Sequence, residues 1–195
     1  QDFYRRHTRA CDARVTLVGP IGREQAESIA NRLLAGWAAH GCAPLPAVPE
    51  VAPLERAQDL RLPFPGAAQA QILIGRPGIA RRDPDYLPLL LANHIFGGGG
   101  FTSRLMREIR EQRGLTYGVY SHFLAGRHAG AFTVMLQTRP DQADLAVSLV
   151  RESLRRFTAE GPTDDEIAAA KTSLIQGFAL RLDSNRKVLD QVAAL

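Results

Sequence analysis

Four consecutive glycines, Gly97 to Gly100, constrain this chain strongly, because a helix is unlikely to continue through a run of residues without side chains. Before them, Asp83-Pro84 supplies the cap and first turn of a predicted helix. The apolar stripe of this helix consists of Leu87, Leu90, Leu91, His94 and Ile95. After the glycines, Thr102 or Ser103 caps a second predicted helix, which Gly114 ends. The glycines therefore separate two adjacent helices.

Three segments around this helix pair are predicted to form β-strands. Ala70 to Ile74 has the composition of a buried strand and precedes the helices. Tyr117 to Phe123 and Gly130 to Gln137 follow them, joined by a hairpin through Gly126-Arg127, and should lie antiparallel. Strands that alternate with pairs of helices favour an α+β fold, in which helices pack on a largely antiparallel sheet.

Two further helices are predicted after the hairpin. The first is amphipathic, starts at Pro140-Asp141 and stops at Gly161-Pro162. Its expected core positions are Leu145, Leu149, Leu154 and Phe157. The second starts with a capping box from Thr163 to Glu166, in which a hydroxyl and a carboxylate satisfy exposed backbone donors, and is predicted to run toward Arg186.

The N-terminal part of the chain is predicted to be a strand, a turn and a helix, followed by a linker. Ala13 to Val18 is strand-like, Gly19-Pro20 makes the turn, and Glu24 to Trp37 places apolar residues on one helical stripe. Cys42 to Leu54 carries four prolines and no periodic pattern, which is typical of an extended linker.

Composition argues against two classes of partner. The net charge of +4 comes almost entirely from arginines, since Lys171 and Lys187 are the only lysines. The arginines are scattered, and no basic run is interleaved with aromatic residues, so we expect no binding to nucleic acid. No stretch approaches the roughly 18 apolar residues of a membrane-spanning helix, so we expect no membrane span.

The sequence also lacks the usual patterns of a catalytic centre. The histidines lie at positions 7, 40, 94, 122 and 128, and none belongs to a His-x-x-Glu-His or His-Glu-x-x-His motif. We therefore expect neither a metal nor another cofactor in this chain, and interpret His94 as a core histidine. Ser103 has no local His and Asp partners, and Cys11 and Cys42 have no basic setting. The sequence does not decide whether the two cysteines form a disulfide bridge.

The segment from Asn93 to Tyr120, NHIFGGGGFTSRLMREIREQRGLTYGVY, is the most informative part of the chain. It resembles the second domain of the pitrilysin, insulysin and mitochondrial processing peptidase family of zinc peptidases. Weaker similarity extends from the opening Phe3 to His7 as far as Gly161-Pro162-Thr163, and so covers nearly the whole chain. In that family the first half carries an inverted zinc motif, and the second half contributes an arginine and a tyrosine to the substrate.

Matching the motif places this arginine at Arg110 and this tyrosine at Tyr117. Independently of the resemblance, Arg110 lies in the last predicted turn of a helix, Gly114 reverses the chain, and Tyr117 starts the next strand, so their polar tips could converge. A guanidinium and a phenol can donate hydrogen bonds to the charge that develops on a peptide oxygen during hydrolysis. The alternative is that Arg110 is a solvated helix charge or helix cap and Tyr117 a half-buried strand residue.

The glycines Gly97, Gly98, Gly99 and Gly100 correspond to the glycine-rich loop of the family, which is thought to contact the incoming peptide. Their exposed backbone would let an extended peptide approach closely. The alternative, which we weigh equally, is a helix cap and a hinge between two helices.

The resemblance implies a zinc-free, substrate-binding half of a zinc-dependent endopeptidase, inactive alone and acting on extended peptides. Zinc is expected in a partner half, in the same polypeptide or a paired subunit. The alternative is a silent structural subunit, like the core proteins of the respiratory bc1 complex. By analogy with paired bacterial halves we expect the periplasm, with the cytoplasm as the alternative.

The same resemblance suggests a division of the chain. Residues 1–40 would be the closing strand and helix of the preceding half-domain, 41–66 a linker, and 67–195 a second, non-zinc domain truncated at its C-terminus. The strand Ala13 to Val18 would then fill the vacant sheet edge, in the same molecule or, in a homo-oligomer, in a neighbour.

Overall fold

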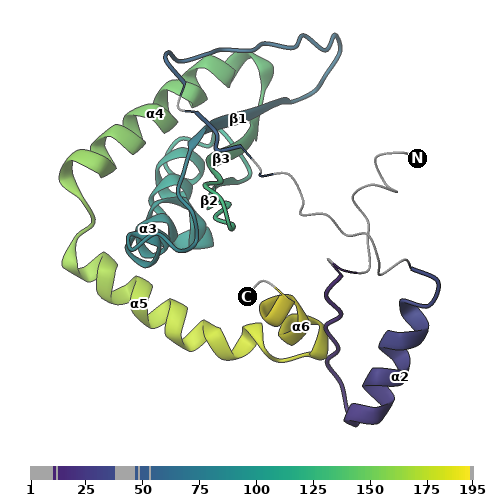
Figure 1. The fold of residues 1–195 in the computed structure, drawn as a ribbon. Helices are drawn as coiled ribbons and strands as arrows, with labels where there is room; N and C mark the ends of the chain where they lie inside the picture. Colours follow the sequence, from purple (N-terminus) through teal and green to yellow (C-terminus); the bar gives the residue numbers. More distant parts are fainter. Residues whose placement is uncertain (1–10, 12, 38–46, 48, 53, 194–195) are drawn as a thin grey trace. The chain divides into compact units, whose positions relative to one another are not determined.

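The computed structural model describes residues 11, 13–37, 47, 49–52 and 54–193 (Figure 1). The chain divides into two compact units. The larger comprises residues 49–174, and the smaller combines residues 1–48 with residues 175–195. The division into half-domains expected from the sequence stays a prediction.

A three-stranded antiparallel sheet forms the centre of the larger unit (Figure 1). Its strands β1 (Ala70–Pro77), β2 (Val119–Phe123) and β3 (Ala131–Thr138) are arranged in the order β1-β3-β2. Leu136 of β3 lies opposite both Ile72 of β1 and Val119 of β2. The predicted antiparallel hairpin is confirmed, and so is the α+β class.

The helical segments of the chain are of three kinds: α-helices, 3-10 turns and π-helical segments. In the larger unit they are α3 (Tyr86–Asn93), the π-helical turn η2 (His94–Gly98), the 3-10 turn η3 (Gly100–Thr102), the π-helical segment η4 (Met106–Glu111), η5 (Pro140–Gln142) and α4 (Ala143–Glu160). Helix α5 (Asp164–Phe178) starts in this unit and ends in the smaller one, which also contains α2 (Arg23–Leu33), η6 (Ala179–Arg181) and α6 (Asn185–Ala193). None of the helices in the described part of the chain is long and apolar enough to span a membrane.

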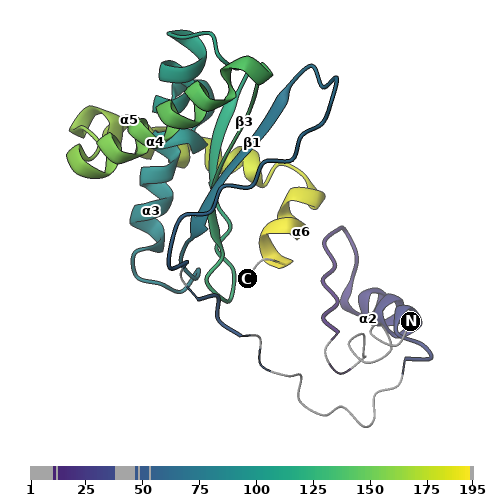
Figure 2. The same ribbon diagram turned by 90° about the horizontal axis from the view of Figure 1, so that it is seen from above.

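The core lies on one face of the sheet, where α3 and α4 are both found (Figure 2). Phe96 of η2 is at its centre, with its ring centroid 5.2 Å from that of Phe157 and 6.4 Å from that of Phe132. The opposite face of the sheet exposes a row of apolar side chains. Leu73 and Tyr120 both lie opposite Met135 in this row.

Helix α4 largely has the orientation predicted for it. Phe157 is buried, and Leu149 and Leu154 are packed against the core. Leu145, however, is 49% exposed, so its assignment to the core was wrong. The buried stripe of α4 consists of Ala146, Val150, Ser153 and Phe157. Its spacing of four, three and four residues leaves Leu145 at the edge.

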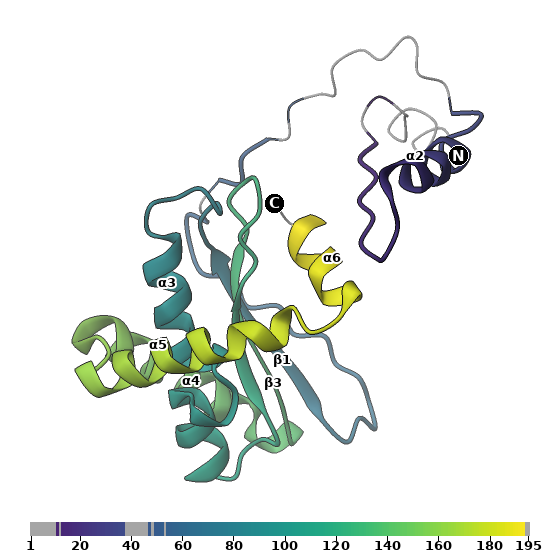
Figure 3. The same ribbon diagram turned by 90° about the horizontal axis from the view of Figure 1, so that it is seen from below.

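The predicted capping box at the start of α5 is confirmed. The Thr163 backbone N–H donates to Glu166 Oε2 at 2.9 Å, and the Glu166 N–H donates to Thr163 Oγ1 at 3.2 Å. Helix α5 ends at Phe178, so the expectation that it runs toward Arg186 was wrong. The chain bends there, and Ser184 begins α6 by accepting a hydrogen bond from the Lys187 N–H at 3.4 Å (Figure 3).

The smaller unit differs from the sequence prediction in two respects. Residues 13–18 form no strand, because a strand requires a hydrogen-bonded neighbour, and no other strand occurs in the described residues of this unit. No residue of α2 is buried, although its apolar stripe predicted a core-facing helix. Cys42 lies outside the described residues, so the question whether it forms a disulfide bridge with Cys11 is left undecided.

Candidate functional site

Arg110 and Tyr117 lie close together, and Phe101 joins them. The guanidinium carbon of Arg110 is 5.8 Å from the ring centroid of Tyr117 and 4.9 Å from that of Phe101. Both distances are within the range of cation–π attraction. Phe101 is 62% exposed and Tyr117 87% exposed, so the two aromatic rings are open to a ligand, whereas Arg110 is half-buried.

The chain reversal at Gly114 brings the two predicted residues together. Gly114 has a φ of +62°, a conformation that glycine adopts at little cost, and its N–H donates to the carbonyl of Arg110 at 2.9 Å. The N–H of Leu115 donates to the carbonyl of Ile109 at 3.1 Å. Leu115 is buried, which anchors the returning chain and leaves Tyr117 beside the helix that carries Arg110.

Thr116 fixes the turn that presents Tyr117. Its hydroxyl lies 2.8 Å from the carbonyl oxygen of Gly118 and 2.6 Å from that of Gln137, and it accepts the Gly118 N–H at 3.1 Å. The hydroxyl has one proton and donates to one of these carbonyls at a time. Sequence reasoning missed both Thr116 and Phe101. The available signal for Phe101 was an aromatic residue directly after four glycines, off the apolar stripe of either helix.

The first of the four glycines is required by packing. Gly97 is buried, and a Cβ atom there would lie 2.5 Å from Ser121 Oγ and 2.8 Å from Leu105 Cδ1. Ser121 is held in turn by Asn93, whose Oδ1 accepts its hydroxyl at 2.7 Å and whose Nδ2 donates to its carbonyl at 3.2 Å. Helix α3 is thereby fixed closely against β2.

The remaining glycines have different surroundings. A Cβ atom on Gly98 would lie 2.6 Å from Asn93 Nδ2, and one on Gly99 would lie 2.5 Å from the carbonyl oxygen of His94. Gly100 has open space around it and a φ of +65°, so its backbone conformation favours glycine. His94 itself is half-buried. The run is therefore largely a tight helix junction, and contact with a peptide stays a prediction.

A partly buried ion pair connects this region to α5. Arg104 Nε and Nη2 donate to Glu166 Oε1 and Oε2 at 2.8 and 2.6 Å, and Nη2 also donates to the Gly161 carbonyl at 3.0 Å. Hydrogen bonds from Arg104, and then from Thr163, lower the pKa of Glu166 to about 2, while burial opposes the shift. The described residues contain no group of three or more His, Cys, Asp or Glu side chains able to hold a metal ion.

Comparison with known proteins assigns the chain to a family. The family model described as the peptidase M16 inactive domain matches residues 1–174. An uncharacterized zinc protease of Streptomyces coelicolor is 30% identical over an alignment of 196 positions, which covers 97% of this chain and 42% of that protein. A non-peptidase homolog from Helicobacter pylori is 38% identical over 84 residues, 43% of this chain and 19% of its own length.

A solved structure gives the same assignment. The crystal structure of a peptidase M16 inactive domain from Pseudomonas fluorescens has a TM-score of 0.74 and 36% identity, covering 88% of this chain and 39% of that one. The chain spans less than half the length of these relatives. The family model covers most of the chain, including Arg110, Tyr117 and the four glycines. The family expected from the sequence is confirmed, and the chain belongs to the peptidase M16 inactive-domain family.

Proposed function

We propose that this chain is the zinc-free, substrate-binding half of a zinc-dependent endopeptidase that acts on extended peptides. The observation that carries the proposal is the aromatic stack formed by the half-buried Arg110 with the exposed rings of Phe101 and Tyr117, in a chain that belongs to an inactive-domain family of peptidases. A cation held between two aromatic rings is oriented without losing its hydrogen-bond donors, which remain available to a peptide backbone.

In this proposal Arg110 and Tyr117 donate hydrogen bonds to the peptide at or beside the bond that is cleaved. Zinc in the partner half supplies the activation of water. Donors placed where charge develops in the transition state are worth about 100- to 1000-fold in rate each. The partner half belongs to the same polypeptide or to a paired subunit, and this chain has no activity alone.

The sheet offers a second means of binding an extended peptide. β3 is the central strand, so β1 and β2 each have one edge without a neighbouring strand in the described part of the larger unit. A peptide can add to such an edge through backbone hydrogen bonds. The strand edge of β2 follows directly after Tyr117, so a peptide paired there would run past the aromatic stack. Of the four glycines, Gly98 to Gly100 would line the same entrance, since Gly97 is buried.

The alternative function is a catalytically silent assembly subunit of the same fold. The Helicobacter pylori relative that is named a non-peptidase homolog favours it, because its matched region is 38% identical to this chain.

The periplasmic location expected from the resemblance, and self-association, also stay predictions. Cell fractionation and light scattering test these two.

Cleavage of a quenched fluorescent peptide separates the two functions. The zinc-bearing half is assayed alone, with this chain, and with its Tyr117→Phe or Arg110→Ala variant. We expect the wild-type chain to restore turnover and either variant to lose it by about 100-fold or more.

Arg81 and Tyr86 provide a matched control, since this second cation–π pair has a distance of 5.5 Å. Tyr86→Phe should leave turnover unchanged. Unchanged turnover with Tyr117→Phe and Arg110→Ala would mean that the chain is a scaffold.

A further inference from the structure

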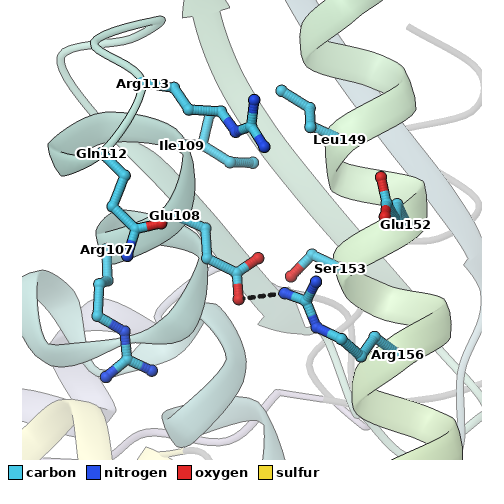
Figure 4. Close-up of a pocket in the computed structure, with 9 residues that line it drawn as sticks. All are labelled: Arg107, Glu108, Ile109, Gln112, Arg113, Leu149, Glu152, Ser153 and Arg156. Carbon is cyan, nitrogen blue, oxygen red and sulfur yellow. Dashed lines mark hydrogen bonds and ion pairs between the residues drawn. The ribbon is translucent and has the colours of Figure 1, made fainter.

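A cavity of about 170 Å³ lies between η4 and α4, and neither Arg110 nor Tyr117 lines it (Figure 4). One water molecule needs roughly 10–15 Å³ of such volume, so this cavity can hold several waters or a small ion. Its polar lining comes from both helices and is formed by Arg107, Glu108, Gln112, Arg113, Glu152, Ser153 and Arg156.

Ser153 brings an unsatisfied hydroxyl to this cavity. The residue is 3% exposed, and its Oγ has no hydrogen-bond partner among the described residues. Figure 4 shows the hydroxyl directed from α4 into the space toward Glu108. Other hydroxyls on α4 bond back to their own helix, as Ser148 does to Asp144 and Thr158 to Leu154, each at 3.0 Å. A buried hydroxyl without a partner is costly, so the position favours a bound polar group.

The cations of the cavity have unused hydrogen-bond donors. Arg156 Nη2 donates to Glu108 Oε1 at 2.5 Å, which neutralises that carboxylate and leaves the other Arg156 donors available. Arg113 has neither an ion pair nor a hydrogen bond within the described residues, and its guanidinium extends across the space toward Leu149. The cavity is also lined by the carboxylate of Glu152, which has no ion pair within the described residues. Its negative charge would repel a bound anion.

We propose that this cavity binds a small oxyanion, a phosphate or carboxylate group, held by Arg113, Arg156 and the Ser153 hydroxyl. The planar guanidinium fork matches the oxygens of either group, and charge-assisted hydrogen bonds are the stronger kind. The site is independent of the proposed peptide-binding role. It uses the face of η4 that carries Arg107 and Glu108 rather than Arg110.

Thermal unfolding of the 195-residue chain tests the site. Sodium phosphate, sodium acetate and sodium chloride are compared at equal ionic strength. We expect an oxyanion at about a hundredfold excess over its Kd to raise the unfolding midpoint by roughly 5–10 °C relative to chloride. A shift with phosphate alone identifies a phosphate site, and one with acetate alone a carboxylate site. Equal midpoints in all three salts would overturn the proposal.

Variants with opposite expected signs make the test specific. Arg113→Gln should abolish the shift, whereas Glu152→Gln should increase it by removing the opposing charge. Ser153→Ala should reduce it while raising the midpoint in chloride. Arg151→Gln is the matched control, because Arg151 is an exposed residue of α4 outside the lining. Retention of the full shift by Arg113→Gln, or its equal loss in Arg151→Gln, would contradict the assignment.

Discussion

The ion pair between Arg104 and Glu166 should make the stability of the larger unit depend on acid in a defined way. In the folded chain the pKa of Glu166 is lowered from 4.5 to about 2, first through the hydrogen bonds from Arg104. Each unit of pKa shift corresponds to about 1.4 kcal/mol, so the shift sets an upper bound near 3 kcal/mol. The two side chains are 11% and 22% exposed, and solvent screening reduces the expected contribution to about 1–3 kcal/mol.

The sign follows from the lowered pKa. The contribution is fully present above the unfolded pKa of 4.5 and is lost as the pH falls through the folded value of about 2. Glu166→Gln removes the charge but keeps the capping box, since glutamine can also accept the Thr163 N–H. We therefore expect the variant to be less stable than the wild type by about 1–3 kcal/mol at pH 7, and the difference to vanish toward pH 2.

Urea unfolding followed by circular dichroism, at steps from pH 7 to pH 2.5, measures this difference. Asp141→Asn is the control, because the pair of Asp141 with Arg139 is exposed, at 60% and 69%, and such pairs are worth only about 0–1 kcal/mol. A difference between wild type and Glu166→Gln that stays constant over this pH range would refute the reasoning, because the destabilisation would then have no connection with the titration of Glu166.

Three further predictions follow from the contacts around the site. Gly97→Ala should destabilise the fold by about 1–3 kcal/mol in urea unfolding, because its Cβ would lie 2.5 Å from Ser121 Oγ, whereas Gly177→Ala, with open space in α5, should be neutral or stabilising. Phe101→Ala should lower turnover in the assembled peptidase, while Phe101→Tyr should keep it, because the ring holds the Arg110 guanidinium. Thr116→Val should lower turnover more than Thr116→Ser, since serine keeps the hydroxyl that fixes the turn before Tyr117; equal effects of the two would contradict this role.

The strands and the β2–β3 hairpin were predictable because their signals are local. The hairpin strands alternate between buried residues such as Val119, Ser121 and Val134 and exposed residues such as Tyr120, which is the period of a half-buried sheet. The capping box that starts at Thr163 was equally easy to recognise in the sequence. The incomplete burial of α2 was not predictable, because an apolar stripe indicates that a surface is to be covered but not what covers it.

The meeting of Arg110 and Tyr117 was predictable for a related reason. A helix that ends at a glycine with positive φ and is followed by a strand must return past its own last turn. Phe101, Thr116 and the cavity lined by Arg113 and Ser153 were not predicted from the sequence. Each depends on which side chains of separate elements face one another, and that information is held in no single segment.

Two segments beside the site, η2 and η4, are π-helical. The N–H of Gln112 donates to the carbonyl of Arg107 at 3.0 Å, five residues back rather than the four of an α-helix. A wider turn changes which residues share a face, yet Leu105, Met106 and Ile109, at the three-and-four spacing of an α-helix, are all buried. Met106 and Ile109 still reach the core, while Glu108 faces α4 and Arg110 lies against Phe101 and Tyr117. One short segment thus serves the core, the cavity and the aromatic stack at once, and substitutions in η4 should couple these three properties more strongly than equivalent changes in the regular helix α4.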